Sequence, residues 1–325
     1  MIWRHLFLRS RRAKIALATL LVYMVVSLVY FFLPWKVRMP VYQKVPQAHR
    51  ILMVGGYKIM TAWDSLALLG RDVRIGLPTG ARADLVYGGH PSQGFQLFGR
   101  VKQLENRGYV VGYSDSLMNP LWVGYRVFDV PSLKSGKRPS RFRGDPRVQS
   151  GVGHDDYTNS GFDRGHMAPN HAVATRYGEK GQKETFLMTN IIPQTPYVNR
   201  GIWKDLEMQV SRRYGLYFGE VWVITGPVFE KPVEKMASGV PIPSRYYKII
   251  VDEDGDELRA LAFLIEADLP PYTRLKTKLV SIDEIEALTD LDFFPALSDA
   301  EQAGLESEPA TRLWPWVRSA LRYHF

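Results

Sequence analysis

The amino-acid sequence predicts an α+β fold with an antiparallel sheet, preceded by one N-terminal transmembrane helix. Three observations support this prediction: an uncharged run near the N-terminus, several β-branched and aromatic runs separated by turns, and a helical segment that lies apart from them. Strands that follow one another through short turns pair antiparallel, so a doubly wound parallel sheet is not expected. The 325 residues suffice for one large domain or two small ones.

The composition is that of an ordinary globular protein. With 46% hydrophobic and 23% charged residues, disordered, collagen-like and coiled-coil chains are excluded. The absence of cysteine excludes disulfides, a thiolate nucleophile and Cys-ligated metal sites. The net charge is +9, but residues 1–38 contain seven basic residues and no acid, so the remainder carries only +2. The charge alone is therefore weak support for nucleic-acid binding.

The first predicted element is a membrane anchor. Residues 15–33, IALATLLVYMVVSLVYFFL, carry no charge, and a helix needs about 20 apolar residues to cross a bilayer. Basic residues precede this run and aromatic residues follow its far end, as is typical at membrane interfaces. We therefore expect a basic cytosolic tail at 1–14 and an uncleaved signal anchor at 15–35.

The basic flank also predicts the location of the chain. A cytosolic N-terminus would place the remaining residues outside the cytosol, on an inner membrane with the domain facing the periplasm. The Arg-rich, acid-free start leaves the mitochondrial inner membrane open as an alternative, with the domain facing the intermembrane space. A cleaved signal peptide is the other alternative, although no small-residue cleavage site follows the apolar run.

Residues 36–94 follow as a juxtamembrane segment of unknown role. After it, strands are expected where β-branched and aromatic residues concentrate: Tyr109–Tyr113, Leu121–Phe128, Val221–Gly226, Tyr246–Val251 and Leu258–Ile265. A turn at 116–120 joins the first two strands, and an acidic turn at 252–256 makes a hairpin of the last two. Residues 281–288 begin with a capping serine and an acidic first turn, which predicts a helix.

A basic loop lies between the second strand and the motifs that carry chemistry. Residues 134–147 contain six lysines or arginines and one acid, Asp145. Such a run is often only a solvated surface, but its position makes it an equally good candidate for a phosphate-binding surface.

Three motifs follow this loop. They are DRGHMAPN at 163–170, TNIIPQ at 189–194 and NRGIWKDLE at 199–207. No GxSxG, HExxH, P-loop or GxGxxG motif is present. Hydrolysis of a phosphodiester needs a base for water, a cation for the phosphate and a metal for the departing oxygen. The histidine, arginine, amide and carboxylate side chains of these motifs supply that set of groups.

The three motifs, in this order, resemble those of the DNA/RNA non-specific endonuclease family, whose active site is of the ββα-metal, or His-Me finger, type. The similarity extends from about residue 95 to residue 297 and includes the first strand pair and the C-terminal helix. It implies an endonuclease domain at 95–325 that requires Mg²⁺, with Mn²⁺ as a substitute. It further implies DNA and RNA substrates with weak sequence preference, and it leaves a homodimer open.

The resemblance assigns roles by position. His166 corresponds to the general base, with an ordinary pKa near 6.5. Asn199 corresponds to the single direct Mg²⁺ ligand, and Glu207 holds the ion through water. On one continuous helix Glu207 would lie about 12 Å along the axis from Asn199. Arg164 is expected to bind the phosphate, and Asn190 to contact the phosphate or to steady the site.

The arginines depart from the family pattern. Relatives carry an arginine four residues after the glutamate, whereas this chain has Ser211 there and Arg212 next. An arginine of the basic loop also contacts substrate in relatives, and Arg141 or Arg143 corresponds to it. The hypothesis is that Arg212 or an arginine of the 138–143 loop supplies a second phosphate contact.

Two other functions stay open. A membrane-anchored nucleic-acid-binding protein with a decayed site is one alternative. A phosphodiesterase for small substrates, such as nucleotides or lipid head groups, is the other.

Overall fold

The computed structural model describes residues 11–33, 40–41, 44–45, 47–48, 51–52, 85–93, 100–130, 134–254, 257–269 and 273–314. The chain divides into two compact units, 1–74 and 75–325. The basic tail up to residue 10 and most of the predicted juxtamembrane segment lie outside the described residues.

The described residues of the first unit include one long helix. Helix α2 runs from Arg11 to Phe32, and the Tyr23 hydroxyl donates a hydrogen bond to the Ile51 carbonyl. Within the part of the chain that the structure describes, no helix combines the length and the apolarity that crossing a membrane requires. The predicted anchor at 15–35 therefore stays a prediction.

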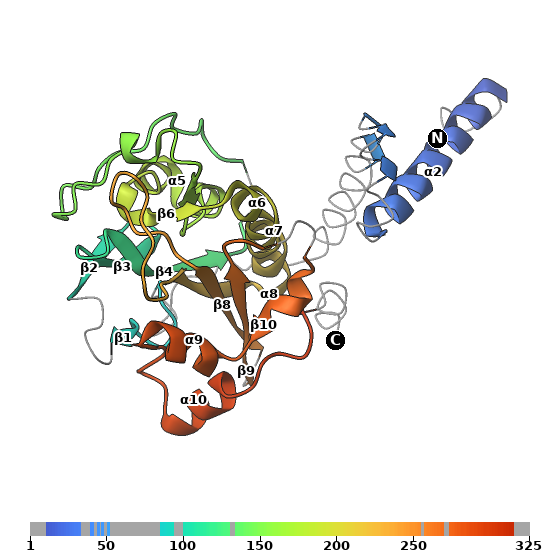
Figure 1. The fold of residues 1–325 in the computed structure, drawn as a ribbon. Helices are drawn as coiled ribbons and strands as arrows, with labels where there is room; N and C mark the ends of the chain where they lie inside the picture. The colour runs from blue at the N-terminus through green and yellow to red at the C-terminus, as the bar shows by residue number, and fades with distance from the viewer. Residues whose placement is uncertain are drawn as a thin grey trace. The chain divides into compact units, whose positions relative to one another are not determined.

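The second unit is built on a seven-stranded antiparallel sheet with the order β10-β9-β8-β7-β4-β3-β2 (Figure 1). Its strands are β2 Val101–Asn106, β3 Tyr109–Ser114, β4 Asn119–Phe128, β7 Glu220–Val228, β8 Arg245–Asp254, β9 Glu257–Glu266 and β10 Leu279–Val280. All neighbouring strands pair antiparallel. The predicted strands and the β8–β9 hairpin are thereby confirmed.

Helices cover both faces of this sheet (Figure 1). One face carries α5 Asn170–Glu184, α6 Pro196–Arg200, α7 Ile202–Gln209, a π-helical turn η4 Val210–Tyr214 and α8 Gly215–Phe218, together with the strand pair β5 Asp163–His166 and β6 Ile191–Gln194. The other carries α9 Ile282–Thr289 and α10 Asp299–Glu306, with the strand pair β1 Ser92–Gln93 and β11 Leu291–Asp292. Short 3₁₀ turns are η2 Asp155–Tyr157, η3 Met188–Asn190 and η5 Leu275–Lys278.

The alternation of side chains along β7 shows why there are two cores. Val221 and Val223 belong to the core under α5–α7, whereas Trp222 and Ile224 belong to the core under α9 and α10. Successive side chains of a strand point to opposite faces, so a strand covered on both sides must be apolar at every position. This requirement explains the uninterrupted apolar run of β7.

The second unit begins earlier than residue 95. Val86 is buried in the core under α9 and α10, and the Tyr87 ring lies edge-on to Trp222 at 5.1 Å. A Cβ atom at Gly124 would approach Val86 Cγ2 to 2.5 Å, so this packing requires glycine there. Residues 85–93 are therefore part of this unit, although the sequence pattern assigned them to the preceding segment.

Candidate active site

The strand pair β5–β6 and the helices α6 and α7 form a ββα arrangement that contains all three motifs. In the β5–β6 register Asp163 lies opposite Gln194 and His166 opposite Ile191. Because strand side chains alternate, Arg164 and His166 share one face of β5. The Trp203 indole N–H donates to the His166 carbonyl at 3.4 Å, which fixes α7 against β5.

His166 sits between two aromatic rings. The ring centroids of Phe142 and Phe186 lie 5.3 and 5.1 Å from that of the imidazole. The residue is 9% exposed, and its Nε2 atom is enclosed without a hydrogen-bond partner among the described residues. Burial, aided by the charge of Arg138, lowers the pKa of His166 to about 3. The imidazole therefore stays neutral at pH values far below the ordinary pKa near 6.5 that was assumed from the sequence.

Asn199 is oriented by Asp163. The Asn199 Nδ2 atom donates to Asp163 Oδ2 at 2.9 Å. An ionised carboxylate only accepts hydrogen bonds, so this contact identifies the amide nitrogen and leaves the amide oxygen without a hydrogen bond among the described residues. Arg200 holds the same carboxylate from the other side at 2.6 and 2.8 Å. Burial opposes ionisation of Asp163, but the bonds from Arg200 and Asn199 lower its pKa overall.

An interruption of the helix at Gly201 separates Asn199 from Glu207. Helix α6 ends at Arg200, and Gly201 has φ −105° and ψ −113°, which are not helical values. Helix α7 begins at Ile202. The single straight helix assumed in the sequence analysis is therefore wrong, and its 12 Å axial separation does not apply.

A buried lysine that sequence reasoning missed acts on Glu207 through its charge. Lys248 of β8 is completely buried, and its Nζ atom lies 4.2 Å from the Trp203 ring centroid. The Glu207 Oε1 atom is enclosed and has no hydrogen-bond partner among the described residues. Burial raises the pKa of Glu207 and lowers that of Lys248, and the opposite charge of each group limits the shift of the other. A lysine within the apolar run YYKIIV is the signal that could have identified it.

Asn190 is fully buried, and its side chain binds backbone groups of two neighbouring segments. Its Oδ1 atom accepts from the Ala168 N–H at 2.8 Å, and its Nδ2 atom donates to the carbonyls of Ala168 and Thr185 at 3.0 Å each. These contacts fix the chain that leaves His166. All three of these contacts are with backbone groups, and both roles expected for Asn190 stay predictions.

Arg164 lines an open cleft beside these residues. Its guanidinium donates to the His154 carbonyl at 2.6 Å and to the Thr158 hydroxyl at 3.0 Å, both neutral acceptors. The cleft has a volume of about 480 Å³ and is lined by His154, residues 157–164, Pro196 and Arg200. Arg164 therefore keeps its full positive charge at the wall of a cavity that adjoins β5 and α6.

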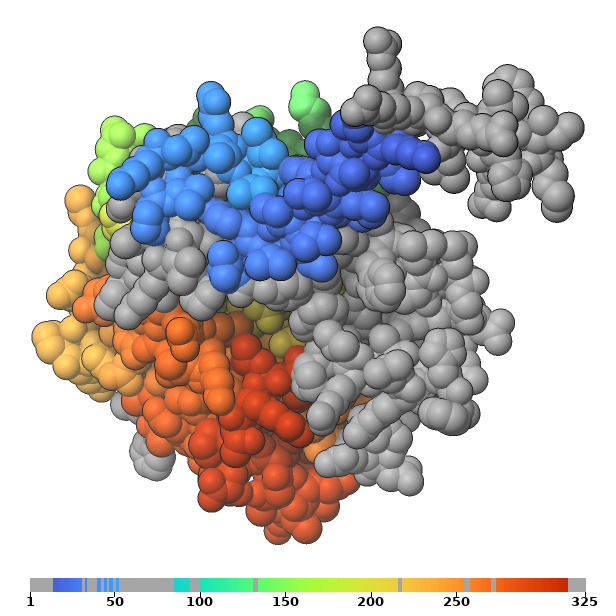
Figure 2. Space-filling view, turned by 90° about the vertical axis from the view of Figure 1, so that its right-hand side faces the viewer, coloured from blue at the N-terminus to red at the C-terminus, as the bar shows by residue number. Residues whose placement is uncertain are grey.

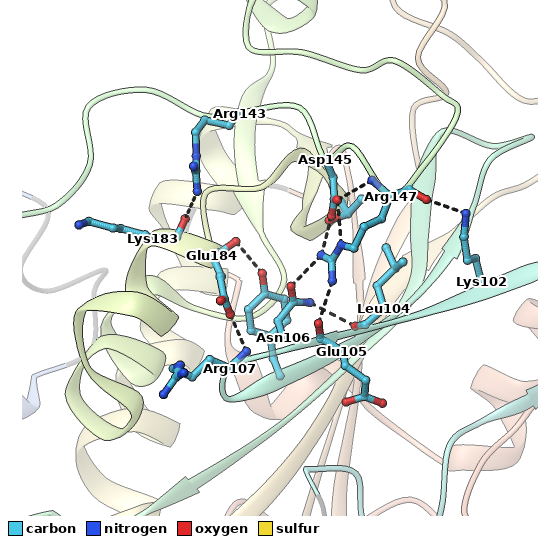
Figure 3. A network of polar contacts seen from close by, with 12 residues as sticks. Lys102, Leu104, Glu105, Asn106, Arg107, Arg143, Asp145, Arg147, Lys183 and Glu184 are labelled. Carbon is cyan, nitrogen blue, oxygen red and sulfur yellow. Dashed lines mark hydrogen bonds and ion pairs between the residues drawn. The ribbon is translucent and has the colours of Figure 1, made fainter.

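The basic loop is tied down next to the site (Figure 3). Asp145 is buried and receives two side-chain hydrogen bonds from Arg147, at 2.6 and 2.9 Å, and one from Thr189 at 2.8 Å. Arg147 also donates to the Glu105 carbonyl and the Asn106 side chain of β2. Earlier in the loop, the Arg143 N–H donates to the Phe186 carbonyl at 2.9 Å. The only acid of the loop thus anchors it.

Three loop arginines have different surroundings. Arg141 forms an ion pair with Asp155 at 2.8 Å, and Arg143 donates to the Lys183 carbonyl at 3.4 Å. Arg138 is exposed, and its guanidinium lies 5.4 Å from the centroid of the Phe186 ring that also contacts His166. Its charge affects the pKa of both His166 and Glu207. Of these three arginines, Arg138 is the one whose charge acts on the groups of the site.

A π-helical turn follows α7 directly. It spans Val210–Tyr214, and Ser211 within it is buried. A π turn contains more residues than an α turn, so it reduces the rotation between Glu207 and Arg212 relative to an ideal α-helix. The rotation of Arg212 away from Glu207 that the sequence suggested is thereby reduced.

Comparisons with known proteins agree with this geometry. The family model described as DNA/RNA non-specific endonuclease matches residues 87–300. The chain is 31% identical over 231 residues to "Nuclease EXOG, mitochondrial" of Danio rerio, a match that covers 66% of each protein. It is 32% identical over 214 residues to a "Nuclease" of Nostoc sp., covering 62% of this chain and 76% of the relative.

Two further similarities concern endonuclease G. The human protein named "Endonuclease G, mitochondrial" is 30% identical over 210 residues, covering 59% of this chain and 70% of its own length. Among solved structures, one titled "Crystal structure of the EndoG/EndoGI complex: Mechanism of EndoG inhibition" aligns with a TM-score of 0.59 and 24% identity, over 69% of this chain and 96% of that chain. That alignment shows a shared fold.

Proposed function

The chain belongs to the DNA/RNA non-specific endonuclease family, and from this premise we propose that it is a metal-dependent endonuclease that hydrolyses phosphodiester bonds in both DNA and RNA. The observation that carries the proposal is that one ββα unit contains both a neutral His166 on β5, whose Nε2 atom has no hydrogen-bond partner among the described residues, and an oriented Asn199 amide on α6. A proton acceptor and a hard oxygen ligand are thereby positioned within one ββα unit.

The residues fit a hydrated Mg²⁺ ion. Mg²⁺ keeps most of its waters and takes only one or two protein oxygens, and the Asn199 amide oxygen is one such ligand. The enclosed, unpartnered Oε1 atom of Glu207 fits a role as acceptor for a metal-bound water. When bound, the ion would supply positive charge to the phosphate oxygens and to the departing oxygen. Mn²⁺ has the same preference for oxygen ligands and is the expected substitute.

In this proposal His166 acts as the general base. The imidazole accepts a proton from a water molecule, whose oxygen forms a bond to phosphorus while the bond from phosphorus to the 3′-oxygen breaks. The products are a 5′-phosphate end and a 3′-hydroxyl that takes a proton from solvent. Arg164 binds the phosphate oxygens, and Asn190 holds the chain after His166 in place. The low pKa of His166 keeps its imidazole neutral at physiological pH, so no bound proton has to leave before it acts as a base.

A second phosphate contact is proposed for Arg138. Its guanidinium has no hydrogen bond or ion pair with another described residue and stacks on the ring beside His166. Arg141 is held in an ion pair by Asp155 and would first have to leave it, whereas Arg143 donates only to a backbone carbonyl at 3.4 Å and stays a second candidate. Arg212, within the π turn, is the remaining candidate. Contacts of this kind recognise the nucleic-acid backbone and give little base specificity.

The experiment that tests the function is a plasmid-nicking assay with and without EDTA. We expect nicking and RNA degradation with Mg²⁺, and neither with EDTA. Binding of plasmid without nicking would favour a decayed nucleic-acid-binding protein. Turnover of a small phosphodiester with intact plasmid would favour the phosphodiesterase alternative. Either result would contradict the proposal.

Membrane attachment and location are separate proposals. The apolar side chains of α2, including Ile15, Val22 and Val29, are mostly exposed, which is consistent with contact to lipid. The mitochondrial names of two relatives support the mitochondrial alternative over the periplasmic one. Washing membranes with alkaline carbonate decides the attachment, because an anchored chain stays in the pellet and a released chain contradicts an anchor. Protease added to mitoplasts is expected to digest the nuclease domain if it faces the intermembrane space.

A further inference from the structure

Three carboxylates meet on the face of the sheet that carries α9 and α10. Asp283 and Glu286 lie one turn apart on α9, and Glu306 is the last residue of α10. One oxygen of each lies within 4.8 Å of the others. The two helices contact each other in this layer. Both helices belong to the C-terminal part of the chain, which is coloured orange to red in Figures 1 and 2. The cluster is thus shared between two helices.

Glu306 is the unusual member of this cluster. It is only 6% exposed, and its Oε1 atom is enclosed without a hydrogen-bond donor among the described residues. A buried carboxylate without a partner is costly when ionised, so such groups are normally paired, protonated or bound to a metal. The burial of an unpartnered oxygen is a second observation, independent of the clustering, that points to a ligand.

Within the part of the chain that the structure describes, no positive charge compensates that of Glu306. Burial, and then the charges of Glu286, Asp283 and Asp292, raise the pKa of Glu306 to about 8. Glu286 accepts from the Phe293 N–H at 2.7 Å, and Asp292 accepts from the Ser92 hydroxyl at 2.8 Å, so both recorded donors are neutral. None of these four acids forms an ion pair with another described residue.

We propose that Asp283, Glu286 and Glu306 bind a divalent cation, with Ca²⁺ as the expected ion, at a site separate from the nuclease centre. Ca²⁺ takes roughly six to eight oxygen ligands in a flexible geometry, so three carboxylates and water molecules can satisfy it. Mg²⁺ requires a stricter octahedron and gives up its waters reluctantly, so it should bind this cluster more weakly. The ion neutralises the repulsion among the acids and fastens the end of α10 to α9.

The test uses the full chain carrying N199A, which removes the proposed ligand of the nuclease metal, and Ca²⁺ itself as the probe. Titration calorimetry is expected to show one Ca²⁺ per chain. At a Ca²⁺ concentration 100 times Kd, Tm is expected to rise by about 5 °C. Adding E306Q should abolish both responses, and without Ca²⁺ it should raise Tm, because glutamine removes a buried ionisable group.

Two further variants keep the test decisive. D283N changes an exposed residue in the first turn of α9, and it is expected to weaken Ca²⁺ binding at least tenfold. E308Q changes an exposed glutamate two residues beyond Glu306 and should leave Ca²⁺ binding unchanged. Absence of Ca²⁺ binding in the N199A chain would overturn the proposal. So would a Ca²⁺ response that survives both E306Q and D283N. Because nuclease activity is not measured, either result is independent of the proposed function.

Discussion

Glu207 and Glu306 are both carboxylates with an enclosed, unpartnered oxygen, but they lie on opposite faces of one sheet and have different neighbours. The positive charge of Lys248 acts on Glu207 and favours its ionised form. Among the described residues, the charges that act on Glu306 are those of other acids, which favour its protonated form. The same residue type is therefore suited to water-mediated metal binding on one face, and requires a cation or a proton on the other.

Replacement of His166 should give the largest loss of activity among the variants on the nuclease face. We expect H166A to lower turnover at least ~100-fold, as is typical for loss of a general base, with nucleic-acid binding retained. The measurement is single-turnover cleavage of a plasmid together with a filter-binding assay. H171A is the matched control, because His171 lies on α5 and has no assigned role. Near-normal turnover in H166A would show that another group accepts the proton.

The orientation of Asn199 predicts the next effect. We expect N199A to lose most of its response to Mg²⁺, because its amide is the proposed direct ligand. Activity measured as a function of Mg²⁺ concentration checks this. R200A should have a much smaller effect, because the bond between Asp163 and Asn199 stays in place when the exposed arginine is removed. An unchanged Mg²⁺ titration in N199A would place the ligand elsewhere.

The loop arginines provide a finer comparison within the same face. We expect R138A to lower kcat/KM about tenfold, the loss of one charge-assisted phosphate contact. R141A should change kcat/KM little, because its guanidinium is already paired with Asp155. Both variants are assayed on the same RNA and at fixed ionic strength, since screening weakens exposed contacts. A larger loss in R141A than in R138A would reverse the assignment.

Lys248 tests the origin of the difference between the two glutamates. Removal of its charge in K248M should raise the pKa of Glu207 further, so that more of it is protonated at pH 7. The pH at which activity is half-maximal should therefore move upward, with a several-fold loss at pH 7 that alkaline pH partly restores. E306Q, on the other face, should leave this pH profile unchanged. A pH-independent loss in K248M would indicate a purely structural role.

The free energy of unfolding should depend on pH with opposite signs for the two faces. His166 has a folded pKa of about 3 against 6.5 in a free chain, so the unfolded state binds protons first and the free energy of unfolding falls as pH drops from about 6.5. Glu306 has a folded pKa of about 8 against 4.5, so the free energy of unfolding falls as pH rises from about 4.5 to 8. Urea unfolding in EDTA across this range checks both slopes. E306Q should flatten only the alkaline slope, and equal slopes in E306Q and the natural chain would contradict the assigned pKa.

Local pattern was sufficient for much of the fold. The apolar runs at 221–226 and 246–251 became β7 and β8, and the predicted capping serine, Ser281, accepts a hydrogen bond from the Glu284 N–H at 3.1 Å. Strand alternation, turn chemistry and caps depend on neighbours within a few residues, so a single sequence displays them. The junction of α6 and α7 was not visible in this way, because a glycine inside a helical pattern does not by itself indicate a break.

By itself the sequence determined which groups are available for chemistry: His166, Arg164, Asn199 and Glu207 lie in motifs whose order and spacing are characteristic of one nuclease family. Only the tertiary structure decided their state. The low pKa of His166 depends on Phe142 and Phe186, and the environment of Glu207 depends on a lysine 41 residues later. Burial and charge act through space, so contacts between distant segments set the protonation of groups that the local pattern can only name.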